Sequence, residues 1–414
     1  MPRDASPAAT LKSFRLLKSW SSLGALPPNP RTMLVYDASL TWCAILLLAI
    51  GLVMVYSSSI VMAESSAHTG FRSWYFLARH AMFVAVGAFA AFVAFQIPMR
   101  AWQRLAPWIF VAGIVLLALV FIPGVGKSVN GSRRWISLAV VNLQPSEFMK
   151  LAAVLYAASY AVRKAAFLHA EQPLKQTLVK GFFPLFLVMV AVSGLLLFEP
   201  DFGALVVIVT IAFGILYLGG LDWRLFLGLL LLLPIGLSAI LVAAPYRLQR
   251  LIAFLDPWSD PFGKGYQLSH SLIAFGRGEW IGVGLGSSVE KLLYLPEAHT
   301  DFLLAVTAEE LGFAGVVLVI GLFVWLLYRT YAIGRQAARL GRAFASLVAL
   351  GIGIWIGVQA FINIGVNMGV LPTKGLTLPL LSFGGSGIVA NCVAVAILLR
   401  ADYENRRLLR GFAV

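Results

Sequence analysis

The feature that most constrains this chain is a series of apolar runs, each about 20 residues long, that recurs along nearly its whole length. A run of that length allows an α-helix to cross the ~30 Å hydrocarbon core of a bilayer. Of 414 residues, 60% are hydrophobic and only 12% are charged, so the length does not indicate several soluble domains. The sequence predicts an all-α polytopic integral membrane protein.

The apolar runs predict about ten transmembrane helices. The expected ranges are 38–62, 75–97, 105–122, 147–162, 181–198, 203–220, 225–244, 302–328, 343–366 and 386–400. The expected divisions are an N-terminal tail (1–36), a membrane domain (37–400) and a C-terminal tail (401–414). Because polar and basic residues precede the first run, we expect no cleavable signal peptide.

The distribution of Lys and Arg predicts the orientation. With both termini in the cytoplasm, the basic residues collect on that side, as membrane proteins prefer. The net charge of +14 then reflects topology, and a nucleic acid partner is not needed to explain it. Three segments rich in Gly, Pro and polar residues (123–146, 245–300 and 367–385) become extracytoplasmic. A connection as long as 245–300 is usually functional or folded, and Ser271–Phe275 within it indicates an interfacial helix.

Asp301 stands where this long polar segment meets the eighth apolar run. An Asp at a helix start is usually a cap, because its carboxylate accepts hydrogen bonds from unpaired N–H groups. The alternative is a reactive carboxylate at the boundary between water and lipid. Two deeper acids, Glu309 and Glu310, need partners or water. They point to different sides of the helix, and Glu309 either faces a polar cavity beneath Asp301 or pairs elsewhere.

Cations in the other two extracytoplasmic segments are candidates for binding an anion. Arg133 and Arg134 precede a Trp, so they either anchor the chain at the interface or hold phosphate oxygens. Lys150 lies one turn inside the fourth helix, three residues after Glu147, and forms either a structural pair or part of a functional site. Lys374 lies in a run broken by Pro and Gly, which is tolerated at membrane depth only against protein or a water-filled cavity.

Two further motifs have structural explanations. Glu199–Gly203 contains two acids, but its Pro and Gly suit a turn and Asp201 suits a helix cap. The segment Gly124–Ser128 looks like a phosphate-binding loop, but Phe121 replaces the first glycine of that motif. We therefore reject the nucleotide-binding interpretation. The two cysteines lie in apolar runs, and neither a disulfide framework nor a metal cluster is supported.

The last extracytoplasmic segment resembles a family signature. Leu371–Pro379 reads Leu-Pro-Thr-Lys-Gly-Leu-Thr-Leu-Pro, and Ser382-Phe383-Gly384-Gly385-Ser386 follows it. Together they are similar to the SEDS proteins (shape, elongation, division and sporulation). The other motifs that agree are Asn130 to Ile136, Gln144 to Lys150, Glu199 to Gly203, Leu295 to Phe302 and Glu309 to Gly312. Tyr36-Asp37 and Asp402-Tyr403-Glu404 resemble the division branch of the family more than the elongation branch.

The resemblance implies a ten-helix peptidoglycan glycosyltransferase that polymerises lipid II on the outer face of the cytoplasmic membrane, at the division septum. Its implied partners are a division-type class B penicillin-binding transpeptidase and other divisome membrane proteins. It implies that Asp301 is catalytic and that the basic candidates are functional. The predicted substrate-binding residues are Arg133, Arg134, Lys150, Lys374, Glu147, Glu297, His299 and Ser382.

Two departures from the family pattern stand out. Phe383 and Gly387 occupy positions where Tyr and Ser are expected, which puts hydrogen bonds of the last loop in doubt. Leu293 occupies a position where some relatives carry a polar residue, so acids near Asp301 are not all interchangeable.

The implied chemistry needs a base and positive charge, because a sugar hydroxyl must lose a proton while a diphosphate departs. Asp301 is the predicted general base, deprotonating the 4-hydroxyl of the acceptor GlcNAc for attack at C1 of the donor MurNAc. Attack opposite the leaving group inverts the α-linkage to a β-1,4 bond. A divalent cation, Mg²⁺ or Mn²⁺, would be held through diphosphate oxygens. No organic cofactor is expected.

Two other functions remain open at this point. A lipid II flippase would explain polar residues inside the membrane, although it needs a path to the cytoplasmic face. A noncatalytic scaffold that recruits the division transpeptidase would not depend on Asp301.

Overall fold

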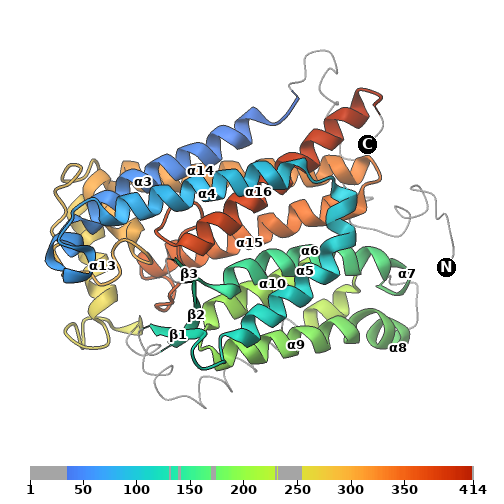
Figure 1. The fold of residues 1–414 in the computed structure, drawn as a ribbon, viewed down its shortest axis with the longest axis horizontal. Helices are drawn as coiled ribbons and strands as arrows, with labels where there is room; N and C mark the ends of the chain where they lie inside the picture. The colour runs from blue at the N-terminus through green and yellow to red at the C-terminus, as the bar shows by residue number, and fades with distance from the viewer. Residues whose placement is uncertain are drawn as a thin grey trace.

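The chain is folded as a bundle of long helices with a small sheet and a folded loop at one end (Figure 1). The computed structural model describes residues 35–129, 132–138, 141–168, 174–228, 231 and 254–412. The long helices are α3 (Ala38–Ser65), α4 (Tyr75–Gln96), α5 (Met99–Leu119), α6 (Pro145–Arg163), α9 (Phe183–Phe198), α10 (Phe202–Leu218), α14 (Leu303–Arg339), α15 (Ala343–Asn367) and α16 (Gly385–Leu409). Shorter elements are η1 (Ala67–Thr69), α7 (Ala165–Leu168), α8 (Leu174–Gln176), the π-helical turn η2 (Thr177–Phe182) and α13 (Tyr266–Gly278).

The helix pattern confirms the predicted class of polytopic membrane protein. Seven helices among the described residues are long and apolar enough to cross a membrane, and α10 is a shorter apolar helix. The predicted seventh helix, 225–244, lies largely outside the described residues. The helix expected around Ser271–Phe275 is present as α13.

Three boundaries differ from the predicted ones. The segment 99–104, expected as a connection, is the first turn and a half of α5, because Pro98 stands at the N-cap where its missing N–H costs nothing. The Arg-rich run after residue 328 continues α14 to Arg339. Residues 401–409 continue α16 rather than forming a separate tail. Polar side chains do not end a helix where it leaves the apolar layer.

The segment 123–146, predicted only as an extracytoplasmic connection, forms a small sheet. It contains three antiparallel strands in the order β1 (Gly126–Val129), β2 (Ser132–Leu138) and β3 (Val141–Leu143). Lys127 pairs with Trp135 and Ser128 pairs with Arg133, so Arg134 is an extra residue on β2. Such a β-bulge redirects a side chain relative to simple alternation.

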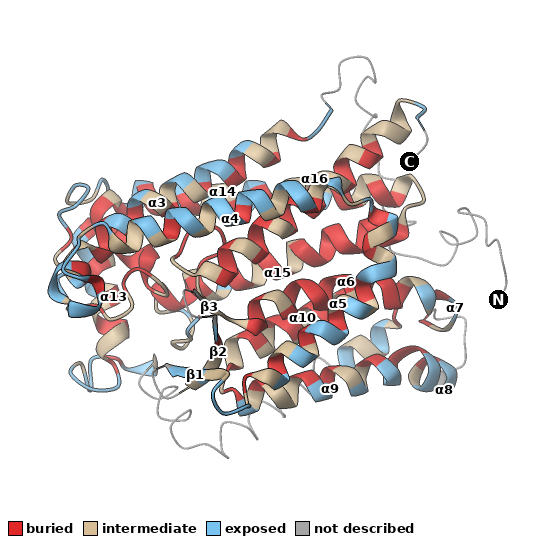
Figure 2. Ribbon diagram, viewed as in Figure 1, coloured by how far each residue is buried: buried red, intermediate tan, exposed pale blue. Residues whose placement is uncertain are grey.

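The core lies along α6, α10 and α15, which Figure 2 shows largely in the colour of buried residues. Helix α15 contacts α14, α10, α6 and α16. The outer helices α3, α4 and α9 instead present many exposed apolar side chains, as lipid contact requires. The first turn of α3 and the last turns of α16 lie at one end of the bundle, whereas the sheet and α13 lie at the other (Figure 1).

The folded loop before α14 is attached at a break in that helix. Gly312 has φ 67° and ψ −166°, a conformation that favours glycine. The segment 279–284 forms hydrogen bonds with the backbone around this break: Val283 N donates to Glu309 O at 2.9 Å, and Phe313 N donates to Glu279 O at 2.9 Å. The backbone groups released by the break are therefore satisfied by the loop.

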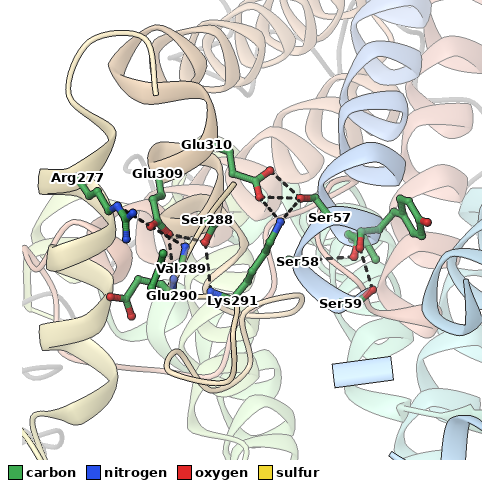
Figure 3. Close-up of polar contacts among 12 residues, drawn as sticks. Ser57, Ser58, Ser59, Arg277, Ser288, Val289, Glu290, Lys291, Glu309 and Glu310 are labelled. Carbon is green, nitrogen blue, oxygen red and sulfur yellow. Dashed lines mark hydrogen bonds and ion pairs between the residues drawn. The ribbon is translucent and has the colours of Figure 1, made fainter. Parts of the chain in front are cut away.

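Side chains reinforce the same attachment (Figure 3). Glu309 accepts hydrogen bonds from the Ser288 hydroxyl and from the backbone N–H groups of Val289 and Glu290, and Arg277 lies 3.6 Å away. Of the two alternatives left open for Glu309, the structure shows pairing elsewhere, because its carboxylate is bonded to the loop.

Glu310 points to another side of α14, as its position along the helix requires. Its carboxylate accepts hydrogen bonds from Ser57 of α3 at 2.7 Å and from Lys291 of the loop at 2.7 Å (Figure 3). Lys291 also donates to Ser57 at 3.0 Å. This buried group joins α3, α14 and the loop.

Candidate functional site

A cavity of about 470 Å³ opens at the end of the bundle that carries the sheet. Its walls come from α4, the sheet, the start of α6, the start of α10, α13, the turn that precedes α14, and the last loop with the start of α16. The three segments predicted from sequence to be extracytoplasmic therefore meet around one space.

Asp301 lines this cavity and is half-buried. It is not the cap that its position suggested, since Phe302 is the N-cap residue of α14 and no side chain makes a cap bond there. Its carbonyl oxygen accepts hydrogen bonds from the side chains of Asn363 at 2.8 Å and Asn367 at 2.9 Å. A Cβ placed on Gly375 would lie 3.1 Å from Asp301 Oδ2, so the last loop approaches the carboxylate closely.

The environment of Asp301 raises the pKa of its carboxyl from 3.8 to about 7. Burial is the main cause, because it disfavours the charged form. The nearby carboxylates of Glu297 and Asp201 raise the pKa further, and the Arg134 guanidinium lowers it. A carboxyl with a pKa near 7 can exchange protons efficiently at neutral pH.

The two neighbouring arginines of β2 are not equivalent. Arg134 lines the cavity and donates to the carbonyl oxygens of Glu199 at 3.2 Å and Pro200 at 2.5 Å. Arg133 is exposed and is not among the residues that line the cavity. The β-bulge at Arg134 accounts for this difference, because it turns that residue inward. The structure brings only Arg134 to Asp301.

The predicted pair of Glu147 and Lys150 is present on α6. Lys150 is fully buried and donates to Glu147 Oε1 at 2.7 Å and to Gln359 Oε1 at 2.7 Å. Glu147 lines the cavity, and its Oε2 has no hydrogen-bond partner among the described residues. The pair therefore has its cation in the core and one carboxylate oxygen toward the cavity.

The turn between α9 and α10 supplies two acids. Asp201 caps α10 through Ala204 N at 3.1 Å, as predicted, and also lines the cavity, where Ser146 donates to it at 2.8 Å. Glu199 is fully buried, and neither of its carboxylate oxygens has a partner among the described residues. Burial and Asp201 raise the pKa of Glu199 to about 8, against the opposing effect of Arg134.

The other predicted residues lie around the cavity to different degrees. Glu297 lines it and accepts a hydrogen bond from Thr300 at 2.8 Å. Lys374 lies with its Nζ 4.3 Å from the centroid of the Phe202 ring, outside the cavity lining. His299 is buried between aromatic rings, 4.7 Å from the Phe76 centroid. Burial is the main cause of a lowered pKa at this imidazole.

Ser382 and Phe383 lie in the last loop, and Gly387 lies in the first turn of α16. The Ser382 hydroxyl accepts a hydrogen bond from Leu378 N at 3.0 Å and so closes a turn away from the cavity lining. Phe383 packs against Phe76 and His299 in place of a hydrogen bond. Gly387 lies beside Glu147, with 3.2 Å between its Cβ position and Oε2.

Sequence reasoning missed a second cation in the lining. Arg79 of α4 lines the cavity and donates to the Tyr75 hydroxyl at 2.8 Å. A signal for it existed, because a charged residue inside an apolar run usually marks a functional position. Arg79 and Arg134 thus approach the same space from a helix and from the sheet.

Comparison with known proteins agrees with this arrangement. The FtsW/RodA/SpoVE cell cycle protein family matches residues 37–407. The chain is 62% identical over 375 residues to the probable peptidoglycan glycosyltransferase FtsW of Aromatoleum aromaticum, covering 91% of this chain and 90% of the relative. The protein of the same name from Burkholderia thailandensis is 53% identical over 413 residues, covering 99% and 88%.

Solved structures show the same fold. A chain from a peptidoglycan synthase complex, described as coordinating polymerization and crosslinking, superposes with a TM-score of 0.71 at 30% identity, covering 90% of this chain and 99% of that one. The rod shape determining protein RodA of Thermus thermophilus gives a TM-score of 0.62 at 27% identity, with 90% and 97% covered. The matches span nearly all of the membrane domain, and the chain belongs to the FtsW/RodA/SpoVE family, whose SEDS signature its last loop carries.

Proposed function

We propose that this membrane protein is a peptidoglycan glycosyltransferase that polymerises lipid II into β-1,4 glycan strands by inverting transfer. The names of its relatives support the enzyme class. The observation that carries the mechanism is Asp301, a carboxyl with a pKa of about 7 in a cavity that also presents Arg134 and Arg79. A base and positive charge are the two requirements of this reaction.

In this mechanism Asp301 acts as the general base. Its carboxylate accepts the proton of the 4-hydroxyl of the acceptor GlcNAc, whose oxygen forms a bond to C1 of the donor MurNAc. The bond between C1 and the diphosphate oxygen breaks, and the lipid diphosphate leaves with the electron pair. Arg134 and Arg79, which line the same cavity, stabilise the charge on that diphosphate. Attack from the opposite side inverts the anomeric centre.

The other cations have supporting roles in this proposal. Lys150 is fully buried and holds Glu147 in place rather than contacting the diphosphate. Lys374 lies over the Phe202 ring beside the last loop, where it would meet a diphosphate that extends beyond the cavity. Arg133 is exposed at the rim and is assigned a minor role.

A divalent cation, Mg²⁺ or Mn²⁺, is compatible with the cavity. Among the described residues, no group of three or more His, Cys, Asp or Glu side chains is placed to hold a metal. The cation would therefore depend on diphosphate oxygens, with the unpartnered Oε2 of Glu147 as a protein oxygen that fits it. When bound, it would supply positive charge to the leaving diphosphate.

We further propose the division septum of the cytoplasmic (inner) membrane as the site of action. The proposed partner is a division-type class B penicillin-binding transpeptidase. Support comes from the division-type relatives and from the structural neighbour, which is part of a peptidoglycan synthase complex that couples polymerization and crosslinking.

Purified Asp301→Asn tests the general base. Loss of a general base typically costs 10²- to 10⁴-fold in rate, so polymerisation of lipid II in detergent, with the partner transpeptidase present, should fall by about that factor. Glu64→Gln is the matched control, because Glu64 is exposed at the end of α3 outside the cavity. Wild-type turnover by folded Asp301→Asn would reject the general-base assignment. Detergent has no leaflets to cross, so glycan synthesis there also separates a polymerase from a flippase.

A further inference from the structure

A stripe of buried amide side chains runs along α15 toward the cavity. Gln359, Asn363 and Asn367 are spaced by four residues and so share one face of the helix. All three are at most 2% exposed. Burying an amide inside an apolar helix costs free energy unless its hydrogen bonds are made. The hydrogen-bond partners of these side chains therefore indicate their role.

The two asparagines converge on the backbone of Asp301. Asn363 Nδ2 donates to the Asp301 carbonyl at 2.8 Å, and Asn367 Nδ2 donates to the same oxygen at 2.9 Å. Asn367 Oδ1 also accepts from Ala305 N at 3.1 Å, in the first turn of α14. The carbonyl oxygen of Asp301 is thus held by two amide donors, and Asn367 also holds the first turn of α14.

The same stripe holds the facing wall of the cavity. Asn363 Nδ2 donates to the Leu376 carbonyl at 2.5 Å, and Gln359 Nε2 donates to the Thr377 carbonyl at 2.9 Å. Leu376 and Thr377 line the cavity. One rigid helix therefore sets the distance between Asp301 and the last loop, a distance that is already close at Gly375.

The lower end of the stripe reaches the buried lysine. Gln359 Oε1 accepts from Lys150 Nζ at 2.7 Å and from Trp355 Nε1 at 2.9 Å. This connects Glu147, another cavity residue, to the same helix. Helix α15 therefore holds three parts of the cavity in place: Asp301, the last loop and, through Lys150, Glu147.

We propose that Gln359, Asn363 and Asn367 are positioning residues, with Asn363 setting the register between the Asp301 carboxylate and the last loop. This rests on the proposed function of Asp301 as the general base. Asn363 is singled out because both of its amide hydrogens are used, one on each wall. A base must be held within a fraction of an ångström of its proton donor, and a small misplacement reduces turnover more than binding.

The test replaces Asn363 with leucine in the full-length chain, which keeps the volume and removes both donors. With purified protein and lipid II in detergent, in the presence of the partner transpeptidase, kcat should fall about 10- to 100-fold while KM changes less than threefold. Asn391→Leu is the matched control, since Asn391 is a buried amide of α16 with an unpartnered Oδ1 and lies outside the cavity lining. It should leave kcat unchanged.

A second variant guards against failure to fold. Asn367→Leu removes one of the two donors to Asp301 and leaves the Leu376 bond in place, so its kcat should fall about 3- to 10-fold. A wild-type kcat in both variants, or a raised KM with unchanged kcat, overturns the positioning role. Asp301→Asn is measured in parallel: if it is inactive while both amide variants turn over normally, only the inference about α15 fails. If Asp301→Asn is active, the proposed role of Asp301 as general base fails, whatever the amide variants show.

Discussion

Two groups of buried acids in this molecule differ in how their carboxylates are hydrogen-bonded. Glu309 and Glu310 accept hydrogen bonds from Ser288, Lys291 and Ser57, so that their carboxylates are fully engaged. Around the cavity, both oxygens of Glu199 and one oxygen of Glu147 have no partner among the described residues.

The two groups therefore differ in role: the paired acids stabilise the fold, and the acids at the cavity are placed for the reaction. Paired carboxylates fix the loop to α3 and α14, because breaking such a pair leaves a buried charge uncompensated. At Asp301, in the cavity, and at Glu199, beside Arg134, burial raises the pKa of the carboxyl. Perturbed acids of this kind gather at functional sites. The loop attachment is therefore expected to control stability and the cavity to control turnover.

The largest expected effect is on the loop attachment. Lys291→Met leaves Glu310 buried without its cation and should lower the free energy of unfolding by about 3–5 kcal/mol. Thermal denaturation of the purified protein in detergent measures the loss. The double variant Lys291→Met with Glu310→Gln should recover much of it, because no charge is then left unpaired. An unchanged melting temperature in the single variant would contradict the division into two groups.

The next effect concerns the arginines of β2. Arg134→Gln should lower kcat/KM for lipid II about 10- to 100-fold, since a charge-assisted contact is worth roughly 1.5–3 kcal/mol. Arg133→Gln, on the exposed side of the bulge, should change it less than about threefold. Steady-state polymerisation measures both variants, and a larger loss in Arg133→Gln would refute the placement of Arg134 in the site.

The same two variants also test how polymerisation activity depends on pH. The base works when deprotonated, so activity should rise with pH through the Asp301 pKa of about 7. Arg134 lowers that pKa, and its removal should therefore move the rising limb to higher pH. Arg133→Gln should leave the limb in place.

Much of the helical frame could be predicted from sequence, because apolar length is a local property. The sheet could not, because Gly and Pro hide the strand period in 123–146, and a one-residue bulge decides which of Arg133 and Arg134 faces inward. The motifs that carry Asp301, Arg134 and Glu147 were found, since charges stand out at membrane boundaries.

Contacts between residues that are distant in the sequence could not be predicted. Lys291 and Glu310 meet across the folded loop, and Ser57 joins them from 253 positions away from Glu310. The amides of α15 did leave a signal in the sequence, because Gln359 and Asn363 are polar residues four positions apart inside an apolar run. That spacing indicates one face of a helix, but it does not reveal that the face meets Asp301.

The smallest expected effect tests the unsatisfied oxygen of Glu147. Gly387 lies in the first turn of α16, and a Cβ there would be 3.2 Å from Glu147 Oε2, so the carboxylate must yield slightly. Serine would add a hydroxyl donor beside that oxygen, a bond worth roughly 1.5–3 kcal/mol to a charged acceptor. Alanine adds the same Cβ without the donor, and it is favoured over serine in helices by about 0.5 kcal/mol.

Gly387→Ser should consequently be about 1 kcal/mol more stable than Gly387→Ala in thermal denaturation without substrate. The alanine variant controls for the crowding that any side chain causes at this position. If alanine proved equal or better, Glu147 Oε2 would already have a donor such as water. Glu147 would then belong with Glu309 and Glu310 as a structural acid, and Asp301 would remain the reactive acid of the cavity.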